Sequence, residues 1–591
     1  MDGIGKGKVG FDFDPFRDVH SFELSGYFGV TREEKTVKGK ERGYIFRVYA
    51  PMADRVYLVA DFTDSKIGKE MERVSGAGVY ECRLEYSKNI EGANYKFRIV
   101  SGNFERYKAD PFARRSEIQS MGASVVMTEC GFSFSDRAWL EKRKKGAKDK
   151  FASSPVNIYE IHLGSWQTKD GRSNLYGDAY LDYGEIASRL VPYVKKMGFT
   201  HVGLLPVLAS SDEGSAGYTP KAFFSIDERQ GEPDSFAFLI NKLHEAGIGA
   251  VCEFCYSDFS DVESSLAMLD GSPLYEKEEG SRKFDISKNE VRCFIASSLD
   301  YFIERYHLDG VKLTGEFTLD NEFMPLLCSF IERKYPDVMI ICEDRAKKSK
   351  AVSFVIDRTF TEATMEYSSY DPYFRRHIEI EKRDDEDLLK GHIPMLSIMK
   401  CDAFSDRGSL IERMYGNYNQ KFASARLAIA YHMLSRGKKS MFMGSEFGQI
   451  KTWDPMYQLE WFMHDFEMHF KLSEYVRRLN NLYLKCPPLY SADASDKSSL
   501  VCKSAGDDGV MVLRRIAKDK SEAFAVFNFS GRPLYSYKLA LPVGEYKEIF
   551  TSDKESFGGD GLSNRSVINS DGSRAFINIA PLSVCILEKI K

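Results

Sequence analysis

The sequence lacks several features that would place a protein in a broad class at once. No stretch approaches the roughly 20 consecutive apolar residues of a membrane-spanning helix, so we expect no contact with a membrane. The segment Met1–Asp18 is rich in glycine and lysine but has no apolar core, which argues against a secretory signal. The formal net charge is −5, which disfavours nucleic acid as a partner because binding it requires a clustered basic surface.

Cysteine is also sparse, with 11 residues scattered along the 591-residue chain. An odd number without regular spacing does not suggest a disulfide framework. Cys252, Cys342 and Cys585 fall within apolar, strand-like runs. Buried free thiols in a reducing compartment explain this distribution, so we expect a cytoplasmic protein.

The chain is too long for one hydrophobic core, and its pattern predicts several domains. After a tail at 1–21, runs such as Tyr44–Tyr49 and Arg55–Ala60 alternate apolar and polar residues between turn-forming breaks. This pattern predicts a β-sandwich over 22–129. A linker at 130–155 follows, and we interpret its charged run at 141–150 as a solvated connector.

From residue 156 onward, strand-like runs alternate with amphipathic helices, for example a helix at Asn289–Tyr306 and a strand at Gly310–Thr314. Strict alternation implies parallel strands with helical crossovers, and over 156–484 it predicts a closed (β/α)₈ barrel. Chemistry in this fold belongs at the C-terminal ends of the strands. Short β runs at 485–591 predict a second, C-terminal β-sandwich, which makes the whole chain a multidomain α/β protein.

The motifs at the predicted strand ends resemble those of the glycogen and starch branching enzymes, which belong to glycoside hydrolase family 13 of the α-amylase superfamily. The resemblance is collinear over nearly the whole chain. It is carried by the opening strand Asn157–Trp166, the segment Leu190–Val202, the strand after it with Leu204-Leu-Pro-Val, Tyr306-His-Leu-Asp-Gly, the late string Gly437–Gln449 and Lys108-Ala-Asp-Pro-Phe-Ala.

This resemblance implies an N-terminal immunoglobulin-like sandwich similar to carbohydrate-binding family 48, then the barrel and the C-terminal sandwich. It implies a substrate class of α-glucans such as glycogen, amylose and starch oligosaccharides. It also implies a retaining transfer that uses one carboxylate as nucleophile and one carboxylic acid as acid/base, without a metal or other cofactor.

The nucleophile position departs from the family pattern. In Asp309-Gly-Val-Lys-Leu-Thr314, Thr314 stands where the family has its nucleophilic Asp, and Lys312 stands where it has an Arg. A threonine hydroxyl is a weak nucleophile unless a base activates it. An ammonium group cannot reproduce the planar fork with which an Arg holds a carboxylate.

The other family positions are partly kept. Glu343 matches the acid/base, and Asp402 matches the third carboxylate, but Cys401 replaces the His before it. Glu253 and Asp258 stand where the family's first barrel motif has an Asp and a His. The two family histidines donate hydrogen bonds to the sugar, which an ionised Asp cannot do and a thiol does weakly.

Tyr218 matches the tyrosine that stacks under the reacting sugar. Glu316 is an alternative nucleophile, because two residues beyond Thr314 on an extended strand it would face the same side. Cys252 and Cys255 form a C-x-x-C pair, with Cys342 and Cys401 predicted at the same barrel face, so a metal or redox site is a second alternative. Buried apolar thiols are the commoner interpretation of such cysteines.

Three hypotheses follow. In the first, the chain is a pseudoenzyme that binds α-glucan or regulates its synthesis, in company with an active branching enzyme or a glycogen synthase. In the second, it is an active 1,4-α-glucan branching enzyme with a rearranged site. In the third, it is a structural protein that binds no sugar. The missing nucleophile favours the first.

Overall fold

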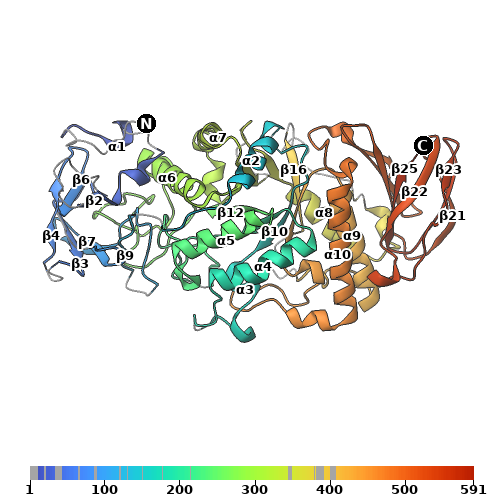
Figure 1. Ribbon diagram of the computed structural model, residues 1–591, viewed down its shortest axis with the longest axis horizontal. Coiled ribbons are helices and arrows are strands. Elements are labelled where there is room, and N and C mark those ends of the chain that lie inside the picture. Colours follow the sequence, from blue (N-terminus) through green and yellow to red (C-terminus); the bar gives the residue numbers. More distant parts are fainter. Residues whose placement is uncertain are drawn as a thin grey trace.

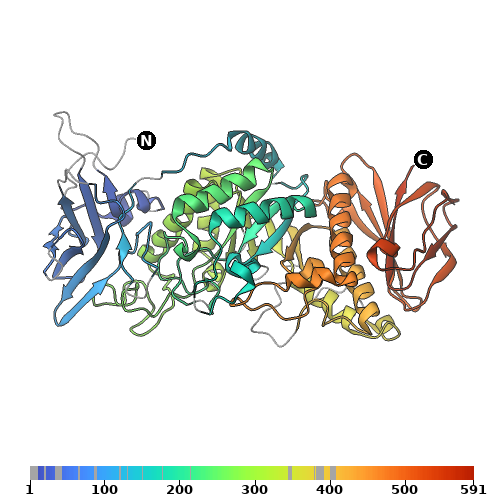
Figure 2. The same ribbon diagram turned by 60° about the horizontal axis from the view of Figure 1, so that its bottom comes forward.

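The computed structural model describes residues 11–18, 22–32, 43–63, 67–84, 89–118, 122–128, 131–149, 151–175, 177–212, 214–343, 349–378, 380, 392–398 and 408–590. Three units lie in a row along the long axis of the molecule, with a barrel between two β-sandwiches (Figure 1). Figure 2 shows the same row from another side. Among the described residues, no helix combines the length and the apolarity needed to cross a membrane.

The N-terminal unit consists of two antiparallel sheets with strand orders β1-β2-β6-β5 and β4-β3-β7-β8, and β9 pairs with β7. The predicted strands at Tyr44–Tyr49 and Arg55–Ala60 are confirmed as β2 and β3. The other elements are α1 (Pro15–Asp18), β1 (Gly29–Arg32), β4 (Lys69–Glu70), β5 (Glu72–Arg73), β6 (Val79–Leu84), β7 (Asn94–Ser101), β8 (Phe104–Lys108) and β9 (Ser124–Val125).

The central unit is the predicted closed barrel, in which every neighbouring pair of strands is parallel. The predicted strand Gly310–Thr314 is confirmed as β13. The full set is β10 (Asn157–Ile161), β11 (His201–Leu204), β12 (Gly249–Cys255), β13, β14 (Met339–Glu343), β15 (Phe354–Ile356), β16 (Ile393–Ile398) and β17 (Lys438–Phe442).

Helices surround the barrel, and the predicted helix at Asn289–Tyr306 is confirmed as α6. Helix α5 begins at Pro233, whose fixed φ suits the first helical position. The others are α3 (Leu163–Trp166), α4 (Tyr183–Met197), α5 (Pro233–Glu245), α7 (Phe323–Lys334), α8 (Arg358–Ser369), α9 (Tyr418–Leu434) and α10 (Glu467–Lys485).

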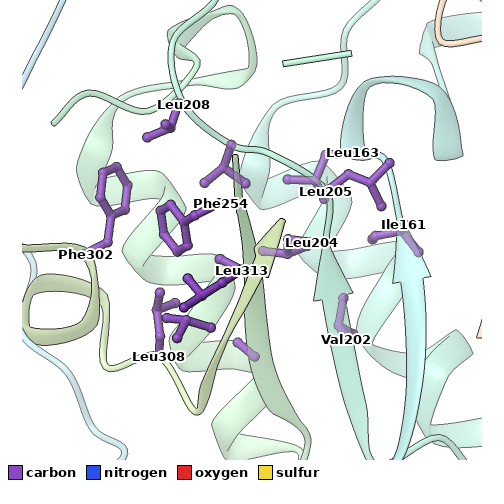
Figure 3. Close-up of a cluster of buried hydrophobic side chains, with 14 of the residues drawn as sticks. Ile161, Leu163, Val202, Leu204, Leu205, Leu208, Phe254, Phe302, Leu308 and Leu313 are labelled. Carbon is purple, nitrogen blue, oxygen red and sulfur yellow. The ribbon is translucent and has the colours of Figure 1, made fainter. Parts of the chain in front are cut away.

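Side chains alternate between the two faces of each barrel strand, and this alternation decides which residues reach the interior. Phe254 on β12 points outward and packs edge-on against Phe302 of α6, with the ring centroids 5.4 Å apart. Figure 3 shows Phe254 and Leu313 in this outer apolar layer. Their neighbours Glu253, Cys255 and Thr314 therefore point into the barrel, at the end where the strands finish.

The linker differs from the expected solvated connector, because part of it forms helix α2 (Arg137–Gly146) and packs on the barrel. The Trp139 indole donates a hydrogen bond to Asp309 Oδ1 at 2.7 Å. Arg143 is mostly buried, pairs with Asp309 and Asp337, and donates to the backbone oxygens of residues 307 and 308. Periodicity could not show this, because the partners of Arg143 come from distant segments.

The C-terminal unit has one sheet of order β18-β19-β20-β25-β22-β23 and a second pair, β21-β24. A buried cluster joins it to the barrel, since Asp493 contacts both Lys438 of β17 and Arg515 of β19. The strands are β18 (Ser499–Lys503), β19 (Val510–Ile516), β20 (Glu522–Asn528), β21 (Leu534–Leu539), β22 (Gly544–Thr551), β23 (Ile568–Ser570), β24 (Ala575–Ile579) and β25 (Ser583–Lys589).

Asp309 is the centre of a buried ionic cluster at the start of β13. Its Oδ2 lies 2.9 Å from His244 Nε2, and His244 Nδ1 lies 2.8 Å from Asp136. Burial by itself would raise the pKa of Asp309, but His244 and Arg143 outweigh it and hold that pKa well below its usual range. Burial likewise opposes the protonation of His244, but Asp309 and Asp136 raise the pKa of His244.

We predict that Asp309→Asn lowers the free energy of unfolding by about 3 kcal/mol at pH 7, because it removes the negative charge that the buried groups of Arg143 and His244 share. The pKa of Asp309 is lower in the folded protein than in the unfolded chain, where it is near 4. Asp309 therefore contributes its full share to the free energy of unfolding above about pH 4, and this share disappears as the pH falls. The difference in the free energy of unfolding between the wild type and the variant should therefore become smaller below about pH 5. Urea titrations across this range measure it.

Asp496→Asn is the matched control, because Asp496 forms a solvent-exposed pair with Arg436. Its effect should stay below about 0.5 kcal/mol. Equal losses in the two variants at pH 7 would contradict the central role of Asp309.

Candidate active site

A pocket of about 340 Å³ opens at the C-terminal ends of the barrel strands, where the fold predicts chemistry. It brings together five of the residues singled out from the sequence: Tyr218, Glu253, Lys312, Thr314 and Glu343. The remaining lining residues are Glu160, Cys255, Gly315, Ile356, Arg358, Thr361 and Ser397.

Lys312 lies at the floor of this pocket between two carboxylates. Its Nζ is 3.0 Å from Glu160 Oε1 and 3.0 Å from Glu253 Oε2. The parallel register places Lys312 beside Glu253 on the neighbouring strand, and Glu160 reaches it from β10. Both carboxylate side chains are almost completely buried.

The two carboxylates keep Lys312 charged inside the barrel. Burial favours the neutral amine and lowers the pKa of Lys312, but attraction to Glu160 and Glu253 outweighs it, so the pKa is raised. Two carboxylates and one ammonium leave this group with one net negative charge. The cluster is stable only while all three members are present, because each buried charge needs its partner.

Thr314 and Tyr218 both bond to the other oxygen of Glu253. Thr314 Oγ1 donates to Glu253 Oε1 at 3.2 Å, and Tyr218 Oη donates to the same atom at 2.7 Å. Burial, and then the negative charge of Glu253, hold the pKa of Tyr218 well above its usual range. Tyr218 is therefore a fixed donor, and Glu253 receives hydrogen bonds or ionic contacts at both oxygens.

Glu343 lines the pocket from the end of β14, the strand that pairs with β13. Its Oε1 lies 3.4 Å from Nη1 of Arg358, the first residue of α8. Both side chains are partly solvent-exposed, so the attraction between them is weakened by water. Glu343 thus sits in an accessible place, whereas Glu160 and Glu253 are held at the floor.

Glu316 does not reach the pocket. The sequence-based alternative required an extended strand beyond Thr314, but β13 ends there, Gly315 has φ +100°, and a 3₁₀ turn (Glu316–Leu319) follows. Glu316 instead pairs with Lys283 on the surface at 2.7 Å. The expectation that Glu316 faces the same side as Thr314 is therefore wrong.

Asp258, a predicted sugar-binding position, lies in the loop after β12, where it forms a β-bridge with Lys283. It is not among the described residues that line the pocket. Cys401 and Asp402 lie outside the described residues, in the stretch that follows β16.

The C-x-x-C pair does not form a joint site. Cys255 lines the pocket, whereas Cys252 and Cys342 belong to the outer apolar layer between strands and helices. Burial raises the pKa of Cys255 and that of Cys252, so both thiols are kept protonated. The part of the chain that the structure describes holds no cluster of three or more His, Cys, Asp or Glu suited to a metal ion.

Glu160 and Arg358 are pocket residues that sequence reasoning missed. Glu160 interrupts the otherwise apolar run of β10, and an isolated acid in a buried strand was a signal that it faces the barrel interior. Arg358 follows the short strand β15, which has only three residues and gives no clear periodicity.

Two family models match the flanking units. Residues 27–113 match carbohydrate-binding module 48 (isoamylase N-terminal domain), and residues 501–589 match the alpha amylase C-terminal all-beta domain. Both agree with the two sandwiches that flank the barrel.

Curated relatives cover almost the whole chain. The 1,4-alpha-glucan branching enzyme GlgB of Aquifex aeolicus (strain VF5) is 32% identical over 607 residues, which is 93% of this chain and 94% of the relative. GlgB of Clostridium perfringens (strain ATCC 13124) is 30% identical over 612 residues, which is 94% of this chain and 90% of the relative. The chain belongs to the 1,4-alpha-glucan branching enzyme family.

Solved structures share the architecture of this branching-enzyme family member. Pullulanase type I from Bacillus subtilis str. 168 gives a TM-score of 0.73 at 16% identity, covering 98% of this chain and 87% of that chain. A putative alpha amylase from Salmonella typhimurium gives 0.70 at 17% identity, covering 95% and 100%. At these identities the likeness concerns the fold.

We predict that Lys312→Met lowers the free energy of unfolding of this branching-enzyme relative by about 3 to 5 kcal/mol, because two buried carboxylates lose their common cation. Adding Glu253→Gln should recover part of the loss by removing one of these charges. Chemical denaturation measures both variants.

Lys283→Met serves as the matched control, since Lys283 forms a similar pair with Glu316 on the surface. Its cost should be below about 1 kcal/mol. If Lys312→Met were as mild as this control, the ionic cluster would not stabilise the barrel interior.

Proposed function

We propose that this protein binds α-glucan and carries out little or no glycosyl transfer. Membership in the branching enzyme family and a match to carbohydrate-binding module 48 support the glucan part of the proposal. The observation that carries the catalytic part is the alcohol of Thr314 at the end of β13, where the family resemblance places a carboxylate nucleophile.

The environment of Thr314 argues against activation of its hydroxyl. A nucleophilic alcohol needs a general base that takes its proton. The carboxylate that accepts from Thr314 is Glu253, which also accepts from Tyr218 and is paired with Lys312. Both oxygens of Glu253 are already engaged by these other groups, so Glu253 is poorly placed to take the proton of Thr314.

A second candidate function is branching with Glu253 as the replacement nucleophile. Glu253 is on the strand next to Thr314, its carboxylate touches the Thr314 hydroxyl, and Glu343 lines the same pocket. In this arrangement Glu253 would form the glycosyl ester and Glu343 would protonate the leaving oxygen. Two observations weigh against it: Glu253 lies on β12 rather than on β13, and both of its oxygens are already engaged, by Tyr218 and Lys312.

A binding protein without transfer would act through its partners. Held on glycogen or amylose, it would bring an active branching enzyme or a glycogen synthase to the same chains, and a cytoplasmic location is part of this proposal. The third hypothesis, a structural protein that binds no sugar, is tested against this proposal by the glycogen-binding measurement described below.

We predict that the wild-type protein makes new α-1,6 branches in amylose at least about 10⁴-fold more slowly than an active family member, by analogy with other enzymes that lose a nucleophile. Debranching followed by chain-length analysis measures this rate. Branches that form readily and vanish in both Glu253→Gln and Glu343→Gln would favour the second candidate.

Restoration provides the positive control. Thr314→Asp alone would set two carboxylates within about 3 Å of each other, where one is driven to its neutral form, so the single change should not restore activity. Thr314→Asp combined with Glu253→Asp, Lys312→Arg, Asp258→His and Cys401→His rebuilds the family pattern and should raise the branching rate above that of wild type.

We also predict that glycogen in a native gel retards the wild-type protein and that Glu343→Gln migrates with it. The reason is that the binding surfaces proposed here do not require a working acid/base. The opposite result is a protein that runs with unchanged mobility in glycogen and in amylose, with pull-downs that recover neither a synthase nor a branching enzyme. That result would contradict glucan binding and support the hypothesis of a structural protein that binds no sugar.

A further inference from the structure

A second pocket, with a volume of about 450 Å³, lies where the barrel meets the C-terminal sandwich. The barrel contributes the end of α8 and the turn after it, and the sandwich contributes the loops before β19 and after β20. Figure 1 shows α8 and α9 at the end of the barrel that faces the C-terminal strands. Ligand sites occur preferentially at such domain junctions.

Arg375 gives this pocket a fixed shape. It is almost completely buried, and its guanidinium donates to the carbonyl oxygens of Tyr370, Ser368 and Phe529 at 3.0, 3.0 and 3.4 Å. The first two belong to the barrel and the third to the sandwich, so Arg375 fastens the two units to each other. Burial lowers its pKa to about 10, and it remains a cation at neutral pH.

Aromatic rings form much of the wall. Tyr367 and Phe529 are buried and pack edge-on with centroids 5.1 Å apart, whereas Tyr373 and Tyr415 are exposed by 62% and 39%. An exposed tyrosine offers a flat apolar face beside a polar hydroxyl. Such a surface suits the alternating C–H faces and hydroxyl groups of a sugar ring.

The polar groups of the pocket are balanced in charge. Its lining contains two carboxylates and two guanidinium groups, from Asp371, Asp507, Arg375 and Arg532, together with the amide of Gln420. Asp371 is already oriented, because the Tyr415 hydroxyl bonds to it and lowers its pKa. Donors and acceptors in equal measure without net charge fit a neutral, polyhydroxylated ligand better than an anion or a cation.

We propose that this pocket is a second binding site for an α-glucan oligosaccharide, separate from the pocket in the barrel. The choice of an α-glucan rests on the proposed function, whereas the neutral sugar class rests on the pocket itself. Helix α8 joins the two sites, since Thr361 lines the first and Tyr367 the second. Six residues along a helix rise by about 9 Å, so the two pockets lie close to each other along the axis of α8.

The experiment is hydrogen–deuterium exchange on the full chain with and without maltoheptaose. We expect slower exchange in peptides covering 370–378 and 504–509 when the sugar is present. Tyr373→Ala should abolish this protection and weaken the binding of this site roughly tenfold, as loss of an exposed aromatic anchor does. Tyr373→Phe keeps the ring and should retain the protection.

Tyr535→Ala is the matched control, because Tyr535 is an equally exposed tyrosine on β21 of the same sandwich and does not line the pocket. It should leave the protection intact. If protection is confined to the N-terminal sandwich or the barrel pocket, the second site is ruled out, whereas the proposal that the protein binds glucan is retained. No protection anywhere, with no retardation by glycogen, would overturn both. Protection here by cellohexaose but not by maltoheptaose would overturn the α-glucan assignment.

Discussion

The ammonium group of Lys312, held inside the barrel between Glu160 and Glu253, is the contact on which the rest of the pocket depends. Two buried carboxylates on nearby strands would repel each other, and one would take up a proton. Lys312 between them offsets that repulsion, and Glu253 is the acceptor that orders Tyr218 and Thr314. The polar side chains at the bottom of the pocket thus hold one another in place by ionic contacts and hydrogen bonds, without a ligand.

This arrangement has a consequence for the kind of chemistry the pocket supports. Glycosyl transfer needs an electron pair that is free to attack carbon and a negative charge that faces the developing cation. At the floor of this barrel, the negative charge of Glu253 is already directed toward Lys312 and two hydroxyl groups. A pocket organised in this way is better suited to holding a sugar by hydrogen bonds than to attacking it.

Regular periodicity explains what the sequence could predict. Helix α6 and strands β2, β3 and β13 lie at their predicted residues because each shows a clear 3.6- or 2-residue pattern. Five residues singled out by the resemblance line one pocket: Tyr218, Glu253, Lys312, Thr314 and Glu343. Contacts between distant segments were not accessible: Glu160 meets Lys312 only through barrel closure, and Arg143 meets Asp309 only when α2 folds against the strands.

The glycine turn after β13 also limits how this barrel could change over evolutionary time. A Cβ atom at Gly315 would come within 2.2 Å of Ser257 Oγ and 2.8 Å of Cys255 Sγ, and the positive φ would strain any side chain there. Substitution at this position therefore cannot bring an acid to the pocket. A carboxylate nucleophile on this strand would therefore have to stand at position 314 itself, and a matching change at Glu253 would be needed to relieve the repulsion between the two carboxylates.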